Sequence, residues 1–477
     1  MTTTDLSSRR RYAASVAGST AYRPRPVRPV PQWWRDVSSS LFWLVLLWVT
    51  SLWVSGGGFQ NLGSLAGSLT SLGRLTGLIA SALLLVQVFL MARIPWFEQA
   101  WGQDALARTH RLVGFTSFNL LWAHIVLITL GYAASTSKGL WGTIVSFVLD
   151  YPGMLLAVAG TAALCMVVVT SVKKARAKLR YESWHLIHLY GYLGAGLALP
   201  HQLWTGQEFL RSTASTVFWW TLYAVCAGAV LVFRVAVPLY RSLGTPLRVE
   251  AVHEEGAGVT SVVVGGPGVA RLEVAPGQFF QWRFLDGPGW TRAHPFSLSA
   301  APDGRTLRIT AAQVGDGTDH LARVRPGTRV LVEGPYGRLH PGVRTQRKVL
   351  LMGAGIGITP LRALLEGLDQ SPGEVVLVHR ARTADDLVLA DELHELATRL
   401  GARYVTVPGP RVPGRSSWLP ASAAHLSDAE ALTQLVPDVA ERDVFLCGAP
   451  GWMDAVRHAA LAAGVPAHQI HLERFVY

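Results

Sequence analysis

The chain is poor in cysteine and in charged residues. Only three of its 477 residues are cysteines, and charged residues make up 16% of the total. Cys165 and Cys226 lie within apolar runs, and the sequence has neither a CxxC pair nor the Cys/His spacing of a zinc site. These absences argue against a disulfide framework and against an iron–sulfur cluster. Because half of the residues are hydrophobic, the composition predicts a membrane protein with a soluble part.

Acidic residues are also scarce, with 31 Asp and Glu against 43 Lys and Arg. Many of the cations flank apolar runs, as the positive-inside rule predicts, so we expect membrane lipid as a partner and no nucleic acid. Residues 1–38 are basic and Pro-rich, and the apolar run that follows begins only near Leu41 and lacks a small-residue cleavage site. We therefore expect a disordered cytoplasmic tail and a membrane anchor, not a cleaved signal peptide.

Long apolar runs fill the first half of the chain. Runs of about 17–25 residues are typical of membrane-spanning helices. Six occur, near 40–56, 73–92, 111–133, 153–172, 184–203 and 215–238. The connecting segments alternate between cation-rich and cation-poor, which predicts a cytoplasmic N-terminus and a cytoplasmic chain after residue 240. We expect a six-helix domain at 39–242 in the plasma membrane.

The second half has a different texture. Long apolar runs disappear, β-branched segments alternate with Gly/Pro turns, and later strands alternate with helices. Residues 243–342 are predicted to form an antiparallel β-barrel domain. Residues 343–477 are predicted to form an open α/β domain with a parallel sheet. The expected fold class is thus a membrane α-helical bundle joined to these two domains.

Four histidines on two of the expected spans have nearly matching separations. His110 and His124 are 14 residues apart, and His188 and His201 are 13 apart. At about 1.5 Å per residue, each pair spans ~20 Å, or nearly four whole turns, and faces one side of its helix. Both spans should run from inside to outside, which pairs His110 with His188 and His124 with His201. Two imidazoles on opposite sides suit a b-type haem, so the pattern predicts two stacked haems that carry electrons across the bilayer.

Other interpretations of these polar residues remain open. A single intramembrane histidine can simply form a hydrogen bond between helices. His185 competes with His188 because residues i and i+3 share a helix face, although its separation of 16 from His201 matches less well. Arg74 is expected to open the second span at its outer end. There it would be an interfacial residue, or it would bind an outer haem propionate or polarise an acceptor.

The segment Arg292-Ala-His-Pro-Phe-Ser297 follows a predicted strand. A flavin needs an aromatic group against its ring, a hydroxyl near N5 and positive groups at its pyrophosphate. Phe296, Ser297 and His294, together with Arg292, could supply these groups, although such a turn can also be structural. Two later turns are Gly315-Asp-Gly-Thr318 and Gly334-Pro-Tyr-Gly337. Each could contact the flavin or could be an ordinary structural turn.

The segment Lys348–Pro360 is a stronger signal. An apolar strand runs directly into the glycine turn Gly-Ala-Gly-Ile-Gly-Ile-Thr-Pro and then a helix. The glycines allow backbone N–H groups to approach a pyrophosphate at a helix N-terminus. His379-Arg-Ala-Arg382 ends the next strand, where Arg380 and Arg382 could bind a 2′-phosphate or form a solvated turn.

Two features near the end of the chain complete the pattern. Cys447-Gly-Ala-Pro450 is another strand end with a glycine turn and would lie by a nicotinamide. At the terminus, Phe475 or Tyr477 could cover a flavin until the nicotinamide displaces it, or could pack a final strand.

Taken together, these residues resemble a known combination of domains. The second half resembles the ferredoxin–NADP reductase superfamily through its HPFS, GAGIGITP, CGAP and ERF motifs. The first half resembles the ferric reductase transmembrane domain through the histidine spacing. The chain from about residue 40 to 477 therefore resembles a bacterial member of the NADPH oxidase/ferric reductase family. The resemblance implies FAD, two b-type haems, and NADPH with NADH possible. It also implies electron transfer to O2, giving superoxide, or to ferric iron.

The resemblance assigns roles to individual residues. The implied iron ligands are His110, His124, His188 and His201. The implied cofactor contacts are Arg292, His294, Pro295, Phe296, Ser297, Thr318, Gly353, Gly355, Gly357, Thr359, Arg380, Arg382, Cys447, Gly448 and Phe475. The implied catalytic residues are Arg74, Ser297, Cys447 and Phe475.

The chain departs from the family pattern in several places. Ile128 stands where oxidases often carry an extra distal histidine, which weighs against O2 as the acceptor. Two residues follow Phe475, which leaves open whether Phe475 or Tyr477 stacks on the flavin. No EF-hand-like loop is present, so we expect no calcium control. The alternatives are a reductase of a quinone or an exported protein, and a haem-free membrane-anchored flavin reductase. No obligatory protein partner is evident.

Overall fold

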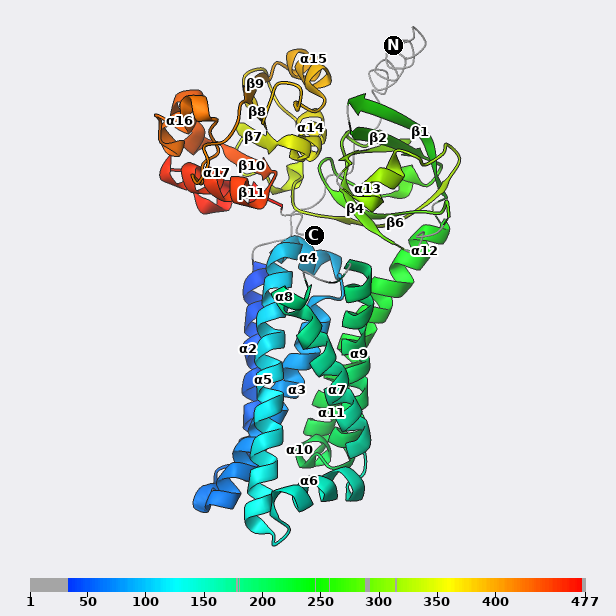
Figure 1. Cartoon of the computed structure of the whole chain (residues 1–477), viewed down its shortest axis with the longest axis vertical. Helices are drawn as coiled ribbons and strands as arrows, with labels where there is room; N and C mark the ends of the chain where they lie inside the picture. Colours follow the sequence, from blue (N-terminus) through cyan, green and yellow to red (C-terminus); the bar gives the residue numbers. More distant parts are fainter. Residues whose placement is uncertain are drawn as a thin grey trace. The chain divides into compact units, whose positions relative to one another are not determined.

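The computed structural model describes residues 33–176, 179, 181–244, 246–256, 258–287, 292–313 and 315–473. The chain separates into two compact units, with the division between Val237 and Pro238 (Figure 1). The first unit is helical and the second contains both sheets, as expected for a membrane bundle followed by a barrel and an α/β domain.

Long helices run alongside one another in the first unit (Figure 1). The main helices are α2 (Trp33–Ser55), α3 (Leu65–Leu90), α4 (Pro95–Trp101), α5 (Gln103–Ser135), α6 (Gly139–Asp150), α7 (Met154–Ser171), α9 (Tyr181–Trp204) and α11 (Thr213–Val230). A π-helical segment, η2 (Leu231–Ala236), and α12 (Val237–Gly244) continue α11. Among the described residues, five helices are long and apolar enough to cross a membrane: Trp33–Ser55, Leu65–Leu90, Ala105–Ser135, Met154–Ser171 and Thr213–Ser242. The remaining expected span, 184–203, falls within the 24-residue α9.

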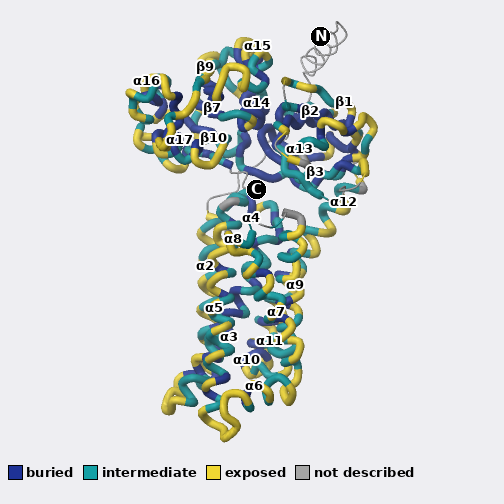
Figure 2. Tube along the Cα trace, viewed as in Figure 1, coloured by how far each residue is buried: buried dark blue, intermediate teal, exposed yellow. Residues whose placement is uncertain are grey.

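Many residues along these helices are exposed or half-buried, as the colours of Figure 2 show. On α5, for example, Leu112 is 67% exposed and Phe115 is 68% exposed. Exposure of large apolar side chains on this scale is typical of a surface that contacts lipid. Small residues allow close packing between the helices, since a side chain at Gly73 would meet Ile128 and one at Gly131 would meet Thr70.

The start of α3 differs from the prediction. The expected span began near residue 73 with Arg74 at its outer end, but α3 begins at Leu65. Ser64 is the N-cap residue, and its hydroxyl accepts a hydrogen bond from Gly67 N at 3.1 Å. The prediction that Arg74 opens the helix is therefore wrong, because the cap adds more than two turns before it.

The second unit begins with an antiparallel six-stranded sheet. Its strands are β1 (Leu247–Gly256), β2 (Val259–Gly265), β3 (Phe279–Phe284), β4 (His294–Ser297), β5 (Thr306–Ala312) and β6 (Arg329–Tyr336), in the order β4-β3-β6-β1-β2-β5. Leu298, just after β4, bridges to Ile309 of β5, and this contact between the two edge strands closes the sheet into a barrel. Its core contains Phe280, Trp282 and Leu307.

A parallel five-stranded sheet follows the barrel. Its strands are β7 (Val349–Ala354), β8 (Val375–Ala381), β9 (Arg403–Pro408), β10 (Asp443–Cys447) and β11 (Ile470–Leu472), in the order β11-β10-β7-β8-β9. Its helices are α14 (Ile358–Gly367), α15 (Ala390–Leu400), α16 (Asp428–Leu435) and α17 (Pro450–Ala462).

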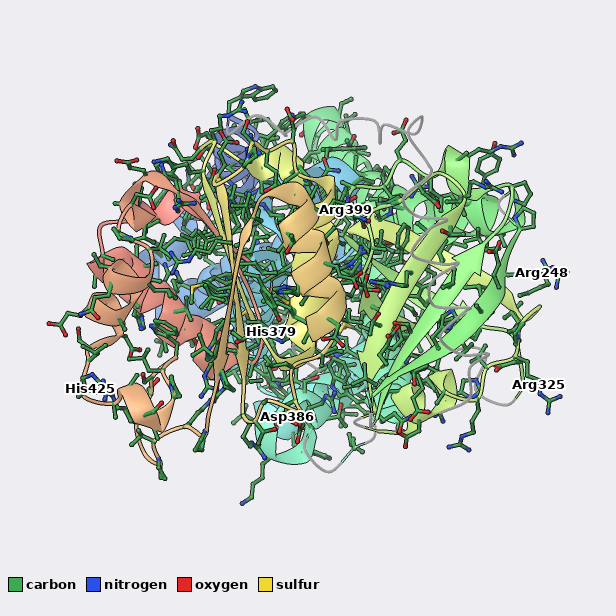
Figure 3. The ribbon with its side chains drawn as sticks, turned by 90° about the horizontal axis from the view of Figure 1, so that it is seen from above. Arg248, Arg325, His379, Asp386, Arg399 and His425 are labelled. Carbon is green, nitrogen blue, oxygen red and sulfur yellow. The ribbon has the colours of Figure 1, made fainter. Side chains whose placement is uncertain are left out.

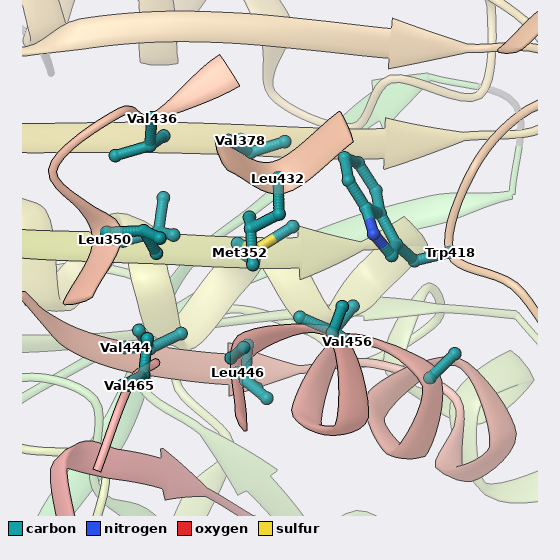
Figure 4. Packing of buried hydrophobic residues seen from close by; sticks show 14 of the residues in the cluster. Leu350, Met352, Val378, Trp418, Leu432, Val436, Val444, Leu446, Val456 and Val465 are labelled. Atoms are coloured by element: carbon teal, nitrogen blue, oxygen red, sulfur yellow. The ribbon is translucent and has the colours of Figure 1, made fainter. Parts of the chain in front are cut away.

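Both faces of the central strands β7, β8 and β10 are buried, so these strands are mostly apolar without alternation. Leu350 and Met352 pack with Leu432 and Val456 in one cluster (Figure 4). The intervening Leu351 packs in a second cluster on the opposite face. Because β8 and β9 lie on one side of β7 and β10 lies on the other, a topological switch point falls between β7 and β10.

Candidate functional site

The four predicted histidines form two pairs between α5 and α9. The ring centroids of His110 and His188 are 6.0 Å apart, and those of His124 and His201 are 6.5 Å apart. A metal ion bound by two imidazole nitrogens at about 2 Å each places the ring centroids roughly 6 Å apart. Both separations therefore fit an iron atom between two rings. His188, and not His185, is the residue that faces His110.

The two histidines on α5 donate hydrogen bonds to the backbone of α3. His110 Nδ1 lies 3.0 Å from Gln87 O, and His124 Nδ1 lies 2.8 Å from Gly73 O. A carbonyl oxygen can only accept, so Nδ1 carries the proton in each ring. In a neutral imidazole the lone pair is then on Nε2, which is the atom that a metal requires.

The two histidines on α9 contact hydroxyl groups. Thr205 Oγ1 is 2.7 Å from His201 Nδ1 and donates its single proton to His201 O at 2.7 Å. Ser171 Oγ is 3.2 Å from His188 Nδ1 and donates its proton to Val167 O. With the hydroxyl proton on the carbonyl, each hydroxyl accepts from Nδ1, and this arrangement again leaves the lone pair on Nε2. None of the four Nε2 atoms forms a hydrogen bond with another described residue.

The sequence did not identify these supporting residues, but one signal for them was present. Gly73-Arg-Leu-Thr-Gly77 is a GxxxG pattern, which is typical of closely packed membrane helices. A Cβ at Gly77 would lie 2.5 Å from His124 Nδ1, so the glycine makes room for the ring. No comparable pattern predicted that Gln87, Ser171 or Thr205 would orient the other three rings.

Arg74 is part of a buried ion pair. Its guanidinium contacts the carboxylate of Glu208 and donates to Gly56 O at 3.2 Å. The Arg74 side chain is 16% exposed and that of Glu208 is 5% exposed. Glu208 was not predicted from the sequence. Its charge compensates that of Arg74, so this arginine does not present an isolated positive charge.

The flavin motif forms β4, at one edge of the barrel sheet. Trp282 Nε1 donates to Phe296 O at 3.0 Å, and the rings of His294 and Phe296 stack at 6.1 Å. Ser297 Oγ is buried and has no hydrogen-bond partner among the described residues. A buried hydroxyl in this state fits a site completed by another molecule, such as a flavin. Arg292 precedes β4, and Pro295 pairs with Gln281.

Thr318 lies elsewhere, in the short helix α13 (Asp316–Leu321). Its hydroxyl caps that helix, because it donates to Gly315 O at 2.8 Å and accepts from Gly315 N at 3.1 Å.

The two glycine turns meet at the switch point of the parallel sheet. Gly353 of β7 pairs with Cys447 of β10, and the turn η5 (Gly355–Gly357) follows. A Cβ at Gly357 would collide with Cys447 O and would lie 2.8 Å from Gly448 Cα. Thr359 Oγ1 donates to Ile356 O at 2.9 Å and steadies the first turn of α14. Such a crevice at the carboxyl ends of parallel strands is where dinucleotides bind.

Cys447 is a buried thiol. Its side chain is 2% exposed, and burial, assisted by the charge of Glu473, raises its pKa above the ordinary value. The group is therefore protonated at neutral pH, which makes it a packing or polarising neighbour and not a thiolate nucleophile.

Arg380 lies in the interior of the nucleotide domain. It is 4% exposed, and its guanidinium donates to Trp418 O and Val407 O, both at 3.1 Å, and to Ala381 O. These carbonyls occupy its Nε and Nη1, which argues against the predicted contact of Arg380 with a 2′-phosphate. Arg382 is exposed, as is Arg411, whose charge together with burial lowers the pKa of Arg380.

His379, labelled in Figure 3, precedes Arg380 on the same strand. It is fully buried, and its Nδ1 is 3.0 Å from Tyr404 Oη. Burial lowers the pKa of His379 to about 4, and burial followed by the charge of Asp391 raises that of Tyr404 to about 12.

The end of the chain approaches the barrel. Gly337 follows β6 with φ +98°, and a Cβ there would lie 2.6 Å from Glu473 Oε2. Phe475 and Tyr477, the two predicted flavin-covering residues, lie outside the described residues.

Two known families match separate parts of the chain. Residues 76–199 match the ferric reductase like transmembrane component, and residues 351–458 match the oxidoreductase NAD-binding domain. The first match includes three of the four histidines, His110, His124 and His188. The second includes the glycine turn and Arg382.

Individual relatives are also similar to the chain. The ferredoxin reductase component of a 3-ketosteroid-9-alpha-monooxygenase from Mycobacterium tuberculosis is 32% identical, covering 43% of this chain and 56% of the relative. Ferredoxin–NADP reductase B of Sorangium cellulosum is 30% identical, covering 39% of this chain and 80% of the relative. The crystal structure of a cytochrome P450 reductase from Amycolatopsis is 26% identical with a TM-score of 0.40, covering 48% and 69% of the two chains. The chain thus spans little more than half the length of the first of these relatives.

Proposed function

We propose that this chain moves electrons across a membrane. It belongs to the ferric reductase-like family, which fuses a transmembrane domain to a ferredoxin reductase-type FAD- and NAD-binding domain. The chain is a membrane-bound, NAD(P)H-dependent oxidoreductase whose electrons leave NAD(P)H through a flavin reductase module. The proposal adds two b-type haems in the helical bundle and an acceptor at the outer face of the plasma membrane. It also assigns the N-terminus and the reductase module to the cytoplasm.

The geometry of the four histidines is the observation that carries this proposal. Each Nδ1 lies beside a carbonyl or hydroxyl oxygen, and no Nε2 has a hydrogen-bond partner among the described residues. Two matched pairs with ring centroids 6.0 and 6.5 Å apart fit metal ligation better than hydrogen bonds that only link helices. The pattern supports His110 and His188 as ligands of an inner iron, and His124 and His201 as ligands of an outer iron.

When bound, FAD takes a hydride and releases electrons singly, and haem iron accepts one electron at a time. The protein supplies orientation. We assign to Ser297 a hydrogen bond toward flavin N5 and to Phe296 and His294 a stacked wall beside the flavin. The glycine turn at Gly355–Gly357 and the turn after Cys447 would hold the pyrophosphate and the nicotinamide end of NAD(P)H.

For the nucleotide, we propose a preference for NADPH that depends on Arg382 and Arg411. Both side chains are exposed near the carboxyl edge of the parallel sheet, where the adenosine ribose is expected. Arg380 supports them from the interior by holding Trp418 O and Val407 O, which fixes the ends of β8 and β9.

Arg74 and Glu208 each follow, in the chain, a residue that contacts an outer histidine. Arg74 follows Gly73, which accepts from His124, and Glu208 comes three residues after Thr205, which contacts His201. We propose O2, giving superoxide, or chelated ferric iron as the acceptor.

The proposal is tested on the full chain purified in detergent. We expect a b-type spectrum with two haems per FAD, reduced under anaerobic conditions by NADPH. The His124→Ala/His201→Ala variant should retain one haem, whereas His425→Ala, at an exposed histidine, should retain both. A spectrum without b-type haem, or one that is unchanged in the double variant, would refute the two-haem arrangement and favour the haem-free flavin reductase.

The acceptor is tested by steady-state NADPH oxidation. Superoxide dismutase-sensitive reduction of cytochrome c would identify O2, and reduction of chelated ferric iron would identify the metal. Haem that is reduced by NADPH but reoxidised by neither acceptor would favour a quinone or an exported protein.

A further inference from the structure

A largely buried network of four charged side chains connects the barrel to the nucleotide domain. Arg308 is on β5 of the barrel, Arg362 and Glu366 are on α14, and Glu392 is on α15. Both arginine side chains are 5% exposed, and those of Glu366 and Glu392 are 13% and 31% exposed. Two positive and two negative charges make the network neutral, as burial demands.

Glu392 is the acceptor at the centre of this network. Arg308 binds it in a bidentate manner, with Nη1 to Oε2 at 3.1 Å and Nη2 to Oε1 at 2.9 Å. Arg362 Nη2 reaches the same carboxylate at 2.7 Å. Burial alone would raise the pKa of Glu392, but the two arginines outweigh it and hold the pKa below its usual range, so the carboxylate is charged at neutral pH.

On the barrel side, Arg308 is fixed to the segment that follows the flavin motif. Its Nε donates to Ser299 Oγ at 3.1 Å, and its Nη2 donates to Ser299 O at 2.8 Å. Ser299 is fully buried and comes two residues after Ser297, the hydroxyl assigned to the flavin. Thr310 Oγ1 donates to Ser299 Oγ at 2.7 Å, which holds this segment against β5 from the other side.

On the nucleotide side, the same network holds the helix that follows the glycine turn. Arg362 contacts Glu366 one turn later on α14, and Glu366 Oε2 accepts from Ala301 N at 2.7 Å. Two cross-links therefore join the 299–308 segment to this domain, one through Glu392 and one through Glu366. Arg362 touches both carboxylates and ties the two cross-links together.

We propose that the Arg308–Glu392–Arg362–Glu366 network is a positioning device that sets the nicotinamide against the flavin for hydride transfer. At one end, Arg308 binds Ser299, which is two residues from Ser297 in the chain. At the other end, Arg362 and Glu366 belong to α14, the helix whose first turn is assigned to the nucleotide. In the step that it serves, a hydride, which is one proton and two electrons, leaves nicotinamide C4 and bonds to flavin N5. Oxidised NAD(P)⁺ is then released. A misplacement of about 1 Å between such partners costs on the order of 100-fold in rate.

This inference rests only on the NAD(P)H–flavin half of the proposed function. It is tested by anaerobic stopped-flow reduction of the flavin in the full chain, a signal that does not depend on the haems or on the outer acceptor. Arg308→Met and Glu392→Gln should each slow flavin reduction roughly 10- to 100-fold and weaken the nicotinamide–flavin charge-transfer band, with KM for NADPH changed less than about threefold. The double variant should be no slower than the worse single variant, because the residues act as a unit.

A second readout does not need catalysis. Hydrogen exchange of the backbone amides of residues 299–308 and of α14 should accelerate together in either variant, since the network joins them. Arg347→Met is the matched control, because Arg347 pairs with Glu374 within the nucleotide domain at 2.5 Å. It should change neither the flavin reduction rate nor exchange in these segments.

If Arg308→Met fails to fold, Arg308→Lys still tests the proposal. It keeps the charge but not the bidentate geometry, and should give an intermediate rate with FAD retained. The proposal is overturned if Glu392→Gln, with FAD bound, reduces its flavin within twofold of the wild-type rate. It is also overturned if KM rises in parallel with the loss of rate, because that result would indicate nucleotide binding and not positioning.

Discussion

Gly77→Ala should remove the outer haem while leaving the inner one. The added Cβ would lie 2.5 Å from His124 Nδ1, 2.9 Å from Cε1 and 3.0 Å from Cγ. Ordinary contact begins at 3.4 Å, so the ring must move by about 0.9 Å. Metal–ligand distances tolerate changes of only about 0.2 Å.

The ring has little freedom to absorb this movement. Its Nδ1 is tied to Gly73 O at 2.8 Å, on the same face of α3 as Gly77. Loss of a supporting contact alone costs roughly 10- to 100-fold in metal affinity, and displacement of the ligand itself should cost at least as much. Helix propensity acts in the opposite direction, because Ala stabilises a helix interior by about 0.8–1.0 kcal/mol over Gly. Loss of haem therefore could not be attributed to a weakened helix.

The assay is the haem content per FAD of the purified full chain. We expect this ratio to fall from two to about one, with the remaining haem still reduced by NADPH and electron delivery to the outer acceptor largely lost. Gly196→Ala, on α9, is the matched control because a Cβ there meets nothing within 4 Å. A Gly77→Ala protein with two haems at unchanged potentials would refute the argument that this glycine shapes the outer site.

Three further predictions concern the second unit. Ser297→Ala should slow anaerobic flavin reduction roughly fivefold to tenfold with FAD retained, through loss of one hydrogen bond; an unchanged rate would remove the hydroxyl from the site. Arg382→Ala should raise KM for NADPH roughly 10- to 100-fold and leave that for NADH unchanged, and equal effects on the two nucleotides would contradict the 2′-phosphate assignment. In the folded protein the pKa of His379 is about 4, whereas in the unfolded chain it is near 6.5. The contribution of His379 to stability is therefore fully present above about pH 6.5 and falls as the pH drops below it. The wild-type free energy of unfolding should lose about 2 kcal/mol from this residue between pH 7 and pH 5, a loss that His379→Gln should not show in thermal unfolding.

Helix periodicity and loop charge predicted the histidine pairs, because both depend on local sequence. A rise of about 1.5 Å per residue decides which residues share a face. The partners that orient the rings, such as Gln87 O, are backbone atoms of another helix. Backbone carbonyls have no signature in the sequence, so these partners became visible only once α3 was placed against α5.

The burial of Arg380 was missed for a similar reason. Two arginines at alternate positions of a strand end look equally suited to a phosphate. Trp418, 38 residues further along the chain, covers Arg380 and accepts its hydrogen bond. Arg74 was misjudged for the same reason, since neither Glu208 nor the Ser64 cap is evident from the span itself.

The hydrogen bonds from α5 to α3 have a mechanical consequence. Gln87 and Gly73 are 14 residues apart, as are His110 and His124, and the two helices are antiparallel. The rise of helix α3 therefore fixes the distance between the two histidine pairs. Because the hydrogen-bond acceptors are main-chain carbonyls, no side-chain substitution at residue 87 removes them. Only a change in helix register can shift them, and it would displace both histidines of α5 at once.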